Sequence, residues 1–314
     1  MDASIIIQVV LLIIGFVFLI KGSDFFVDGA SSIASLLKIP TIIVGLTIVA
    51  FGTSAPEAAV SITSSLTGNN AMAVSNVIGS NLFNILMVIG VSALLGDLLM
   101  EKSVLNKDLP FLVAITILFA AFILIGWNIT NIEGIILLII LIAYILYLIR
   151  SSKKSADANK VEKAKLSLPK SIIFIVIGLA GIILGGDLVV NSASDIAMAL
   201  GMSETLVGLT IVAIGTSLPE LVTSLTALKK GENQLVIGNV IGSNIFNILF
   251  VLGASSAISA IPLDSSMLID VVFMIAVTIL CFIFGKTQEK YDKKEGIILV
   301  ALFIVYMAFA ILRN

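Results

Sequence analysis

Two glutamates occupy equivalent places in the two halves of this 314-residue chain. Glu57 is the only ionisable residue in 39–96, and Glu220 is the only one in 205–228. Both stretches are long and apolar, and a lone charge at the centre of a membrane span costs about 2.5 to 3.5 kcal/mol. No Lys or Arg in the same stretches can pair with either acid, so we expect the partner to be a cation that binds and leaves.

Each glutamate ends the motif Gly-Thr-Ser-x-Pro-Glu, at Gly52–Glu57 and at Gly215–Glu220. Proline lacks an N–H and clashes with the carbonyl four residues earlier, so each motif predicts a break in a helix. The break should free backbone oxygens around 50–53 and 213–216, and such oxygens beside a carboxylate suit a hard cation. The alternative is a kink that only shapes packing, with the glutamate capping free N–H groups.

A second polar block accompanies the glutamate motif in each half. Ser80 and Asn84 lie four residues apart on one helical face, and Ser243 and Asn247 repeat them. Small polar residues in membrane spans often serve only to join helices, but their repetition beside the glutamates favours a ligand role. Calcium takes about six to eight oxygen ligands, and sodium also seeks oxygen. The cluster contains no soft ligand, which argues against copper or zinc.

The composition is that of a membrane protein. Hydrophobic residues make up 59% of the chain and charged residues 12%, with a mean hydropathy of +1.19; these values exclude a water-soluble globular protein. A net charge of −2 argues against nucleic-acid binding. The chain has no histidine, which excludes His-ligated zinc and histidine triads and relays. The single Cys281 cannot form an intrachain disulfide, and no enzyme-like nucleophile arrangement is recognisable.

Hydropathy predicts ten membrane-spanning helices. The expected spans are 4–21 (with a continuation to 37), 41–66, 71–96, 109–127, 132–149, 171–190 (with a continuation to 200), 205–228, 234–260, 266–285 and 296–312. The first span has no basic flank and no small-x-small cleavage site, so we expect it to be retained rather than removed as a signal peptide.

The distribution of Lys and Arg predicts the orientation of these spans. Seven basic residues lie in 150–170, so the 151–170 loop should be a charged, solvated linker on the cytoplasmic side of the cell membrane. Ten alternating spans then place both termini outside. The opposite loops contain no Lys or Arg, which agrees; they lie near 67–70, 128–131, 201–204 and 261–265.

The two halves form an internal repeat. Val44–Glu57 matches Val207–Glu220 at twelve of fourteen positions, and Asn76–Leu86 matches Asn239–Leu249 at ten of eleven, both at an offset of 163. The predicted fold is therefore an all-α membrane domain with five spans in 1–150, the linker, and five in 171–314. An odd number of spans gives the repeats opposite topologies, with the site at the midplane between them; duplication without functional symmetry is the alternative.

The paired blocks resemble the alpha-repeats of sodium/calcium exchangers in the cation/calcium antiporter superfamily. The resemblance implies that Glu57 and Glu220 are central calcium ligands, aided by the Thr53 and Thr216 carbonyls, and that Asn84 and Asn247 line the central position. It also implies flanking sodium sites, which would draw on Ala50, Thr53, Ser54 and Ser80 in one half and on Ala213, Thr216, Ser217 and Ser243 in the other.

The sequence departs from the family at one position. Sodium/calcium exchangers usually carry an acid where this chain has Asn247, so the predicted site has two carboxylates instead of three. The expected function is antiport of calcium against sodium by alternating access, in a chain that can act as a monomer and needs no cofactor besides the transported ions. The resemblance implies that the first and sixth spans slide across the core. The alternatives are calcium/proton exchange, because buried carboxylates can hold protons, and a cation channel, although channel filters usually need several subunits.

Overall fold

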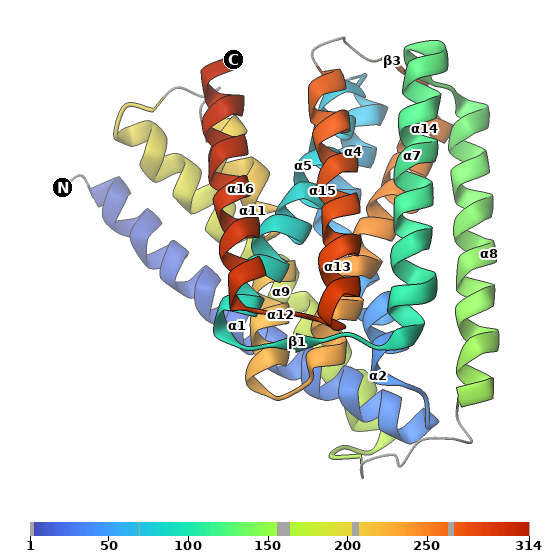
Figure 1. Ribbon diagram of the computed structural model, residues 1–314. Helices are drawn as coiled ribbons and strands as arrows, with labels where there is room; N and C mark the ends of the chain where they lie inside the picture. The colour runs from blue at the N-terminus through green and yellow to red at the C-terminus, as the bar shows by residue number, and fades with distance from the viewer. Residues whose placement is uncertain (1–2, 69, 156–163, 203–206, 263–266, 314) are drawn as a thin grey trace.

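The chain folds into a bundle of long helices, joined at two corners by short antiparallel strand pairs (Figure 1). This computed structural model describes residues 3–68, 70–155, 164–202, 207–262 and 267–313. The first half contains α1 (Ala3–Leu37), α2 (Thr41–Val44), η1 (Gly45–Val49), α3 (Ala50–Thr53), α4 (Ala55–Leu66), α5 (Asn70–Phe83), η2 (Asn84–Ile89), α6 (Gly90–Leu95), β1 (Leu98–Leu99), η3 (Val104–Asp108), α7 (Leu109–Gly126), β2 (Asn128–Ile129) and α8 (Asn131–Ser155), where η marks a π-helical segment.

The second half repeats this order of elements, except that its described residues include no counterpart of α2 and no π-helical segment matching η3. It contains α9 (Leu168–Ala199), η4 (Gly208–Val212), α11 (Ala213–Gly215), α12 (Leu218–Lys229), α13 (Asn233–Phe246), η5 (Asn247–Leu252), α14 (Gly253–Ile258), β3 (Ile261–Pro262), α15 (Met267–Gln288), β4 (Lys290–Tyr291) and α16 (Lys293–Arg313).

The helices agree with the predicted spans. Within the described ranges, eight helices are long and apolar enough to cross a membrane, and the pair Thr41–Thr53 and Ala55–Leu66, bent by 48°, makes a ninth. The remaining expected span, 205–228, is represented by η4, α11 and α12, while its predicted beginning at 205–206 lies outside the described residues. The longer versions of the first and sixth spans are correct, since α1 ends at Leu37 and α9 at Ala199. In the predicted linker, α8 continues to Ser155, and 156–163 are not described.

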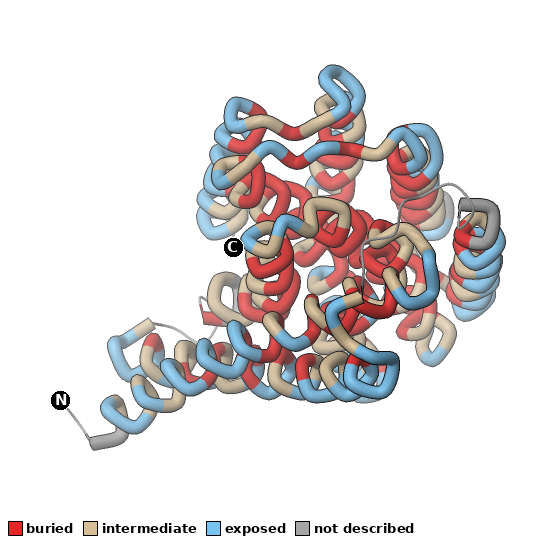
Figure 2. The backbone as a smooth tube through the Cα atoms, turned by 90° about the horizontal axis from the view of Figure 1, so that it is seen from below, coloured by how far each residue is buried: buried red, intermediate tan, exposed pale blue. Residues whose placement is uncertain are grey.

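Burial follows the pattern of a membrane protein. In the most apolar 18-residue stretch of each span, 94% of the residues are buried in α13–η5–α14 and 78% in α5–η2–α6. The corresponding share is only 17% in α1 and 22% in α16. Figure 2 shows the buried residues gathered in the middle of the bundle. The outer helices expose many large Ile, Leu, Val and Phe side chains, and an apolar surface of this extent requires lipid or another apolar partner.

Short strand pairs join the two halves symmetrically. Leu98 pairs with Tyr291 where β1 meets β4, and Ile129 pairs with Ile261 where β2 meets β3. Under the repeat, β1 corresponds to β3 and β2 to β4, so each strand pair is the counterpart of the other. The loop after the third span of one half therefore contacts the loop between the fourth and fifth spans of the other.

The structural repeat extends beyond the two sequence blocks. The Tyr144 hydroxyl donates to Asp108 Oδ1 at 3.0 Å, and the Tyr306 hydroxyl donates to Asp270 Oδ1 at 3.1 Å. A phenylalanine stacks on each tyrosine: Phe111 on Tyr144 at 4.6 Å between ring centroids, and Phe273 on Tyr306 at 4.9 Å. All three positions are related by an offset of 162, because 270 − 108, 306 − 144 and 273 − 111 are each 162. The same polar contact thus joins the fourth and fifth spans in both halves.

The long helices α1 and α9 form a close antiparallel pair. Gly15, Gly22 and Gly29 recur every seven residues along the contact face of α1. A Cβ on Gly22 would lie 2.8 Å from the Gly178 carbonyl oxygen, and one on Gly178 would lie 2.5 Å from the Phe26 backbone nitrogen. Glycine allows this backbone approach because it has no side chain, which is a common basis for helix association in membranes.

We expect Gly178→Ala to destabilise the protein by about 1–3 kcal/mol, since the new methyl group would push two helix backbones apart. The measurement is the unfolding temperature of the purified protein in detergent, which should fall. Gly186→Ala is the matched control on the same helix, because a Cβ there would meet Pro219 Cγ at an ordinary 3.5 Å. Equal unfolding temperatures for Gly178→Ala and the wild type would contradict the close-packing argument.

Candidate cation-binding site

The predicted helix breaks are present at both glutamate motifs. In the first half α3 ends at Thr53 and α4 begins at Ala55, with Ser54 between them at φ −83°, ψ 7°. In the second half Ser217 has nearly the same backbone angles, φ −94°, ψ 5°. Each proline lies at the start of the following helix, where its missing N–H costs no hydrogen bond. Both glutamates therefore lie in the first turn of a helix, where the helix dipole stabilises a negative charge.

The two breaks face each other across the repeat boundary. Ser54 of the first half donates to Glu220 Oε1 at 3.0 Å, and Ser217 of the second half donates to Glu57 Oε1 at 3.0 Å. Both glutamates have 0% exposure. The N-cap serines make no side-chain capping bond, whereas each glutamate carboxylate lies next to the N–H of its own residue, so capping by the glutamates stays an alternative. Each carboxylate is also oriented by a serine of the opposite half.

Two asparagines support these breaks and were not among the residues predicted from the sequence. Asn76 donates to the Glu57 carbonyl at 3.2 Å and to Ser61 at 2.9 Å. Its counterpart Asn239 donates to the Glu220 carbonyl at 3.3 Å and to Ser224 at 3.0 Å. The spacing could have indicated a role for Asn76 in the site. Asn76, Ser80 and Asn84 follow each other at intervals of four and thus lie on one helical face.

The asparagines also engage the threonines of the opposite breaks. Thr53 Oγ1 donates to Asn239 Oδ1 at 2.9 Å, and Thr216 Oγ1 donates to Asn76 Oδ1 at 3.4 Å. These threonine hydroxyls are consequently occupied by protein partners. This arrangement leaves the threonines' carbonyls, rather than their hydroxyls, as the atoms to consider as ligands.

Several buried oxygens at the site lack a hydrogen-bond donor in the described part of the chain. They are Glu57 Oε2, Glu220 Oε2, Asn84 Oδ1 and Asn247 Oδ1. A buried polar atom left without a partner costs free energy, and these four are carboxylate and amide oxygens, which Ca²⁺ and Na⁺ accept as ligands. The donor set therefore fits a hard cation.

The asparagines sit where each central helix changes its geometry. The π-helical segment η2 begins at Asn84, and η5 begins at Asn247. Segments of this kind often occur at functional sites. Each also packs against a helix of the other half that carries a glutamate, η5 against α4 and η2 against α12. Asn247 is further held by Asn81, whose Oδ1 accepts from Asn247 Nδ2 at 3.1 Å.

The remaining predicted residues lie around the two carboxylates. The Ser80 hydroxyl lies next to Glu57 and the Ser243 hydroxyl next to Glu220. The prediction of a freed carbonyl is wrong at Ala50, because the helix reaches Ser54, and the Ala50 oxygen accepts the Ser54 N–H at 3.0 Å and lies 3.5 Å from Ser243 Oγ. A carbonyl oxygen has two lone pairs, so the ligand role implied for Ala50 by the resemblance stays a prediction. Ala213 is the first residue of α11.

We expect Ser54→Ala and Ser217→Ala each to weaken cation binding about tenfold. Each substitution removes a hydrogen bond to a buried carboxylate, and bonds to charged groups contribute about 1.5–3 kcal/mol. The measurement is the apparent affinity for Ca²⁺ of the purified variants. Ser255→Ala serves as the control, since Ser255 is buried but does not contact the glutamates. Unchanged affinity in both site variants would show that the serines do not orient the carboxylates.

Comparison with known proteins places the chain among cation exchangers. CaxA of Alkalimonas amylolytica is 39% identical over 313 residues, which cover 96% of this chain and 98% of CaxA. The sodium/calcium exchanger MaX1 of Methanosarcina acetivorans is 30% identical, over 96% of this chain and 98% of MaX1.

A solved structure of the sodium-calcium exchanger NCX_Mj, soaked with Na⁺ and Sr²⁺, superposes with a TM-score of 0.86 at 32% identity and covers 97% of this chain and 98% of that one. The chain also matches the family described as sodium/calcium exchanger protein over residues 7–150 and 170–312. These matches extend through both repeats and both glutamate motifs, and the chain belongs to the sodium/calcium exchanger family.

Proposed function

We propose that this chain exchanges Ca²⁺ for Na⁺ across the membrane, using the site between the two helix breaks alternately from each side. The observation that carries the proposal is the reciprocal pair of contacts from Ser54 to Glu220 and from Ser217 to Glu57. These contacts bring one carboxylate from each inverted half to a single buried site, with one oxygen of each left for a cation. The family membership and the NCX_Mj similarity support the same function.

The proposed ligands follow from the geometry and from the family resemblance. Glu57 and Glu220 would supply the two negative charges that balance one Ca²⁺, and the Asn84 and Asn247 amide oxygens would line the centre. The flanking Na⁺ positions would use carbonyl and hydroxyl oxygens of Ala50, Thr53, Ser54 and Ser80 and of Ala213, Thr216, Ser217 and Ser243. Ca²⁺ and Na⁺ are the transported substrates in this proposal, and no further cofactor is required.

Obligatory exchange follows from the cost of the empty site. Two carboxylates buried together without a cation repel each other and have lost their hydration. A conformational change through that state would have a high barrier, so the protein would cross between its two states only when loaded. Since Ca²⁺ and Na⁺ need the same carboxylate oxygens, binding of one would displace the other and couple their movements.

The test is uptake of calcium-45 into proteoliposomes under an imposed ion gradient. We expect an outward Na⁺ gradient to drive uptake above equilibrium, and an outward proton gradient without Na⁺ to drive none. Uptake driven by the proton gradient and indifferent to Na⁺ would favour a calcium/proton exchanger instead. Passive calcium flow without any opposing ion would favour a channel.

We also propose that both termini lie outside the cell and that the 151–170 loop is cytoplasmic and links two repeats of one membrane domain. The Lys-rich loops support this orientation. A cysteine placed at Ser167, in a chain carrying Cys281→Ala, should react with an impermeant maleimide only after cells are opened. Reaction in intact cells would reverse the orientation. The proposed unit of transport is one chain, because both carboxylates come from the same molecule.

A further inference from the structure

The α1–α9 pair packs more closely on one end of the bundle than on the other. Under the repeat, α1 corresponds to α9 and α12 to α4, so a symmetric molecule would pack α9 along α4 as it packs α1 along α12. In the described residues α1 packs along α12, whereas α9 makes no comparably extensive contact with α4. Figure 1 shows α1 crossing the bundle beside α12. The structure is therefore closed at the α12 end, where the Lys230 turn lies, and less closed at the α4 end.

A small cavity borders the helix break of the first half. It has a volume of about 90 Å³ and is lined by Phe51, Ser54, Ala55, Ala58 and Phe250, among others. Ser54 is the residue that donates to Glu220. The cavity therefore leaves space beside a residue that holds the Glu220 carboxylate.

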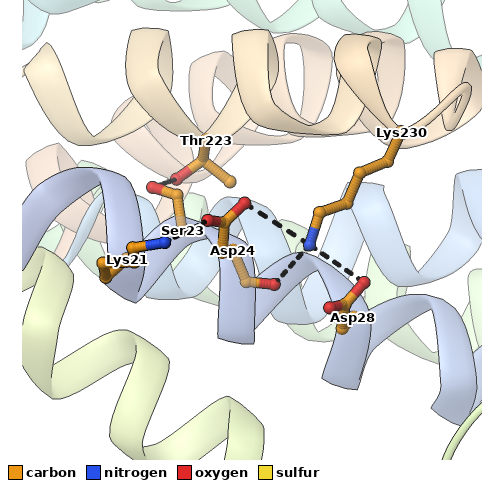
Figure 3. Close-up of polar contacts among 6 residues, drawn as sticks. All are labelled: Lys21, Ser23, Asp24, Asp28, Thr223 and Lys230. Atoms are coloured by element: carbon orange, nitrogen blue, oxygen red, sulfur yellow. Dashed lines mark hydrogen bonds and ion pairs between the residues drawn. The ribbon is translucent and has the colours of Figure 1, made fainter.

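A polar cluster holds α1 at the closed end (Figure 3). Lys230 Nζ lies 2.9 Å from Asp28 Oδ1 and 3.5 Å from Asp24 Oδ1, and it donates to the Asp24 carbonyl at 2.7 Å. Two turns earlier on α12, the Thr223 hydroxyl lies 3.1 Å from the hydroxyl of Ser23, the neighbour of Asp24. The Lys230 side chain is 21% exposed, so water screens these ion pairs only in part.

Among the residues that the structure describes, the other end of the molecule shows no equivalent cluster. With the repeat offset of 163, Lys230 corresponds to Thr67 and Asp28 to Asn191, while Asp24 corresponds to Asp187. Thr67 Oγ1 donates to the Thr63 and Ser64 carbonyls of its own helix and thus does not bind α9 through those bonds. The sequence therefore breaks the symmetry of the repeat at the place where the structure is asymmetric.

From these contacts we infer that Lys230, Asp24 and Asp28 form a latch that holds α1 against α12 and favours the state closed at the Lys230 end. The inference rests on the proposed alternating-access function. When the α1–α9 pair moves to close the α4 end, α1 must leave α12, and these contacts break. A ligand or contact that exists in only one of two states shifts their equilibrium by its own interaction free energy. The latch thereby sets how often the site faces each side.

The test uses the full-length chain with Cys281→Ala and a reporter cysteine at Ser23, which is 0% exposed in the closed contact. The protein is purified in detergent and kept at saturating Na⁺ without Ca²⁺, because the loaded protein can cross between its two states, and the rate of maleimide labelling at position 23 is measured. Labelling requires α1 to separate from α12. We expect Lys230→Gln to raise the rate about fivefold, as suits a partly exposed ion-pair network.

Three further variants make the result specific. Lys229→Gln removes the same charge at the neighbouring exposed residue and should leave the rate unchanged. Lys230→Arg keeps the cation and should label as slowly as the reporter protein, and Asp28→Asn, which removes the carboxylate 2.9 Å from Lys230 Nζ, should raise the rate as Lys230→Gln does. Equal rates in Lys230→Gln and the reporter protein, or an equal increase in Lys229→Gln, would overturn the latch.

Labelling needs no transport, so its outcome is separate from that of the flux assay. Latch-dependent labelling in a protein without sodium-driven exchange would overturn the proposed function and leave the latch. Normal exchange with labelling that does not depend on Lys230 would overturn the latch and leave the proposed function.

Discussion

Glu57→Gln and Glu220→Gln are each expected to reduce sodium-driven calcium uptake by at least about a hundredfold. Each substitution removes one of the two charges that balance Ca²⁺ in a site with 0% exposure. A hundredfold loss corresponds to about 2.7 kcal/mol, which is well below the attraction between a carboxylate and a divalent ion at contact distance, even at an effective dielectric of about 20. Because the two residues are counterparts in the repeat, the two losses should be similar.

The same variants should fold as well as the wild type or better. Glutamine keeps the size of the side chain while removing a buried charge, and natural sites often lose stability for the sake of function. The unfolding temperature in the absence of Ca²⁺ and Na⁺ is thus expected to stay the same or rise. Glu289→Gln is the matched control, since Glu289 forms only an exposed ion pair with Lys102 at 3.8 Å. Wild-type exchange in either site variant would refute the shared carboxylate site.

Asn247→Asp is expected to tighten Ca²⁺ binding by at least about tenfold. The substitution places a third carboxylate at the position where the family resemblance implies an acid, on a residue with 0% exposure. At about 6 Å and an effective dielectric of about 20, a new unit charge attracts a divalent ion by about 5 kcal/mol. The cost of removing the new carboxylate from water offsets most of this attraction. Asn81 can accommodate the change, because its amide can rotate to donate to the new carboxylate.

The added charge should also change the coupling to sodium. One more negative charge requires one more cation for neutrality, so the number of Na⁺ ions exchanged per Ca²⁺ should rise. The equilibrium Ca²⁺ gradient reached at several fixed Na⁺ gradients measures this number. Asn84→Asp should act in the same direction, as its position is equivalent, whereas Asn247→Ser, which keeps an oxygen without a charge, should not tighten binding. Unchanged affinity and stoichiometry in Asn247→Asp would show that position 247 does not face the cation.

Membrane physics made much of the fold predictable from the sequence. Spans must be helical and about 20 residues long, and the two glutamates stand out because a lone acid in such a span is costly. The breaks before Glu57 and Glu220 could be located because proline removes a specific hydrogen bond. The extent of α1 and α9 remained open, since Lys21, Asp24 and Asp187 interrupt their hydropathy without ending the helices.

Features that depend on contacts between the halves could not be predicted. Asn76 and Asn239 each join a break of one half to a threonine of the other, and sequence periodicity shows only which residues share a face. The counterpart contacts of Asp108 with Tyr144 and Asp270 with Tyr306 follow an offset of 162 instead of 163, because one residue is lost between the third and fourth spans. A comparison of identical blocks at one offset therefore missed them.

The most direct test of a single shared site is a binding competition on the purified protein in detergent. Calcium-45 binding is measured at equilibrium while Na⁺ is raised, with K⁺ replacing Na⁺ to hold ionic strength constant. If both ions use the Glu57 and Glu220 carboxylates, Na⁺ will displace Ca²⁺ completely, and the apparent Kd for Ca²⁺ will rise with more than the first power of the Na⁺ concentration. Calcium that stays bound at saturating Na⁺, or an apparent Kd that does not change with Na⁺, would contradict the shared site.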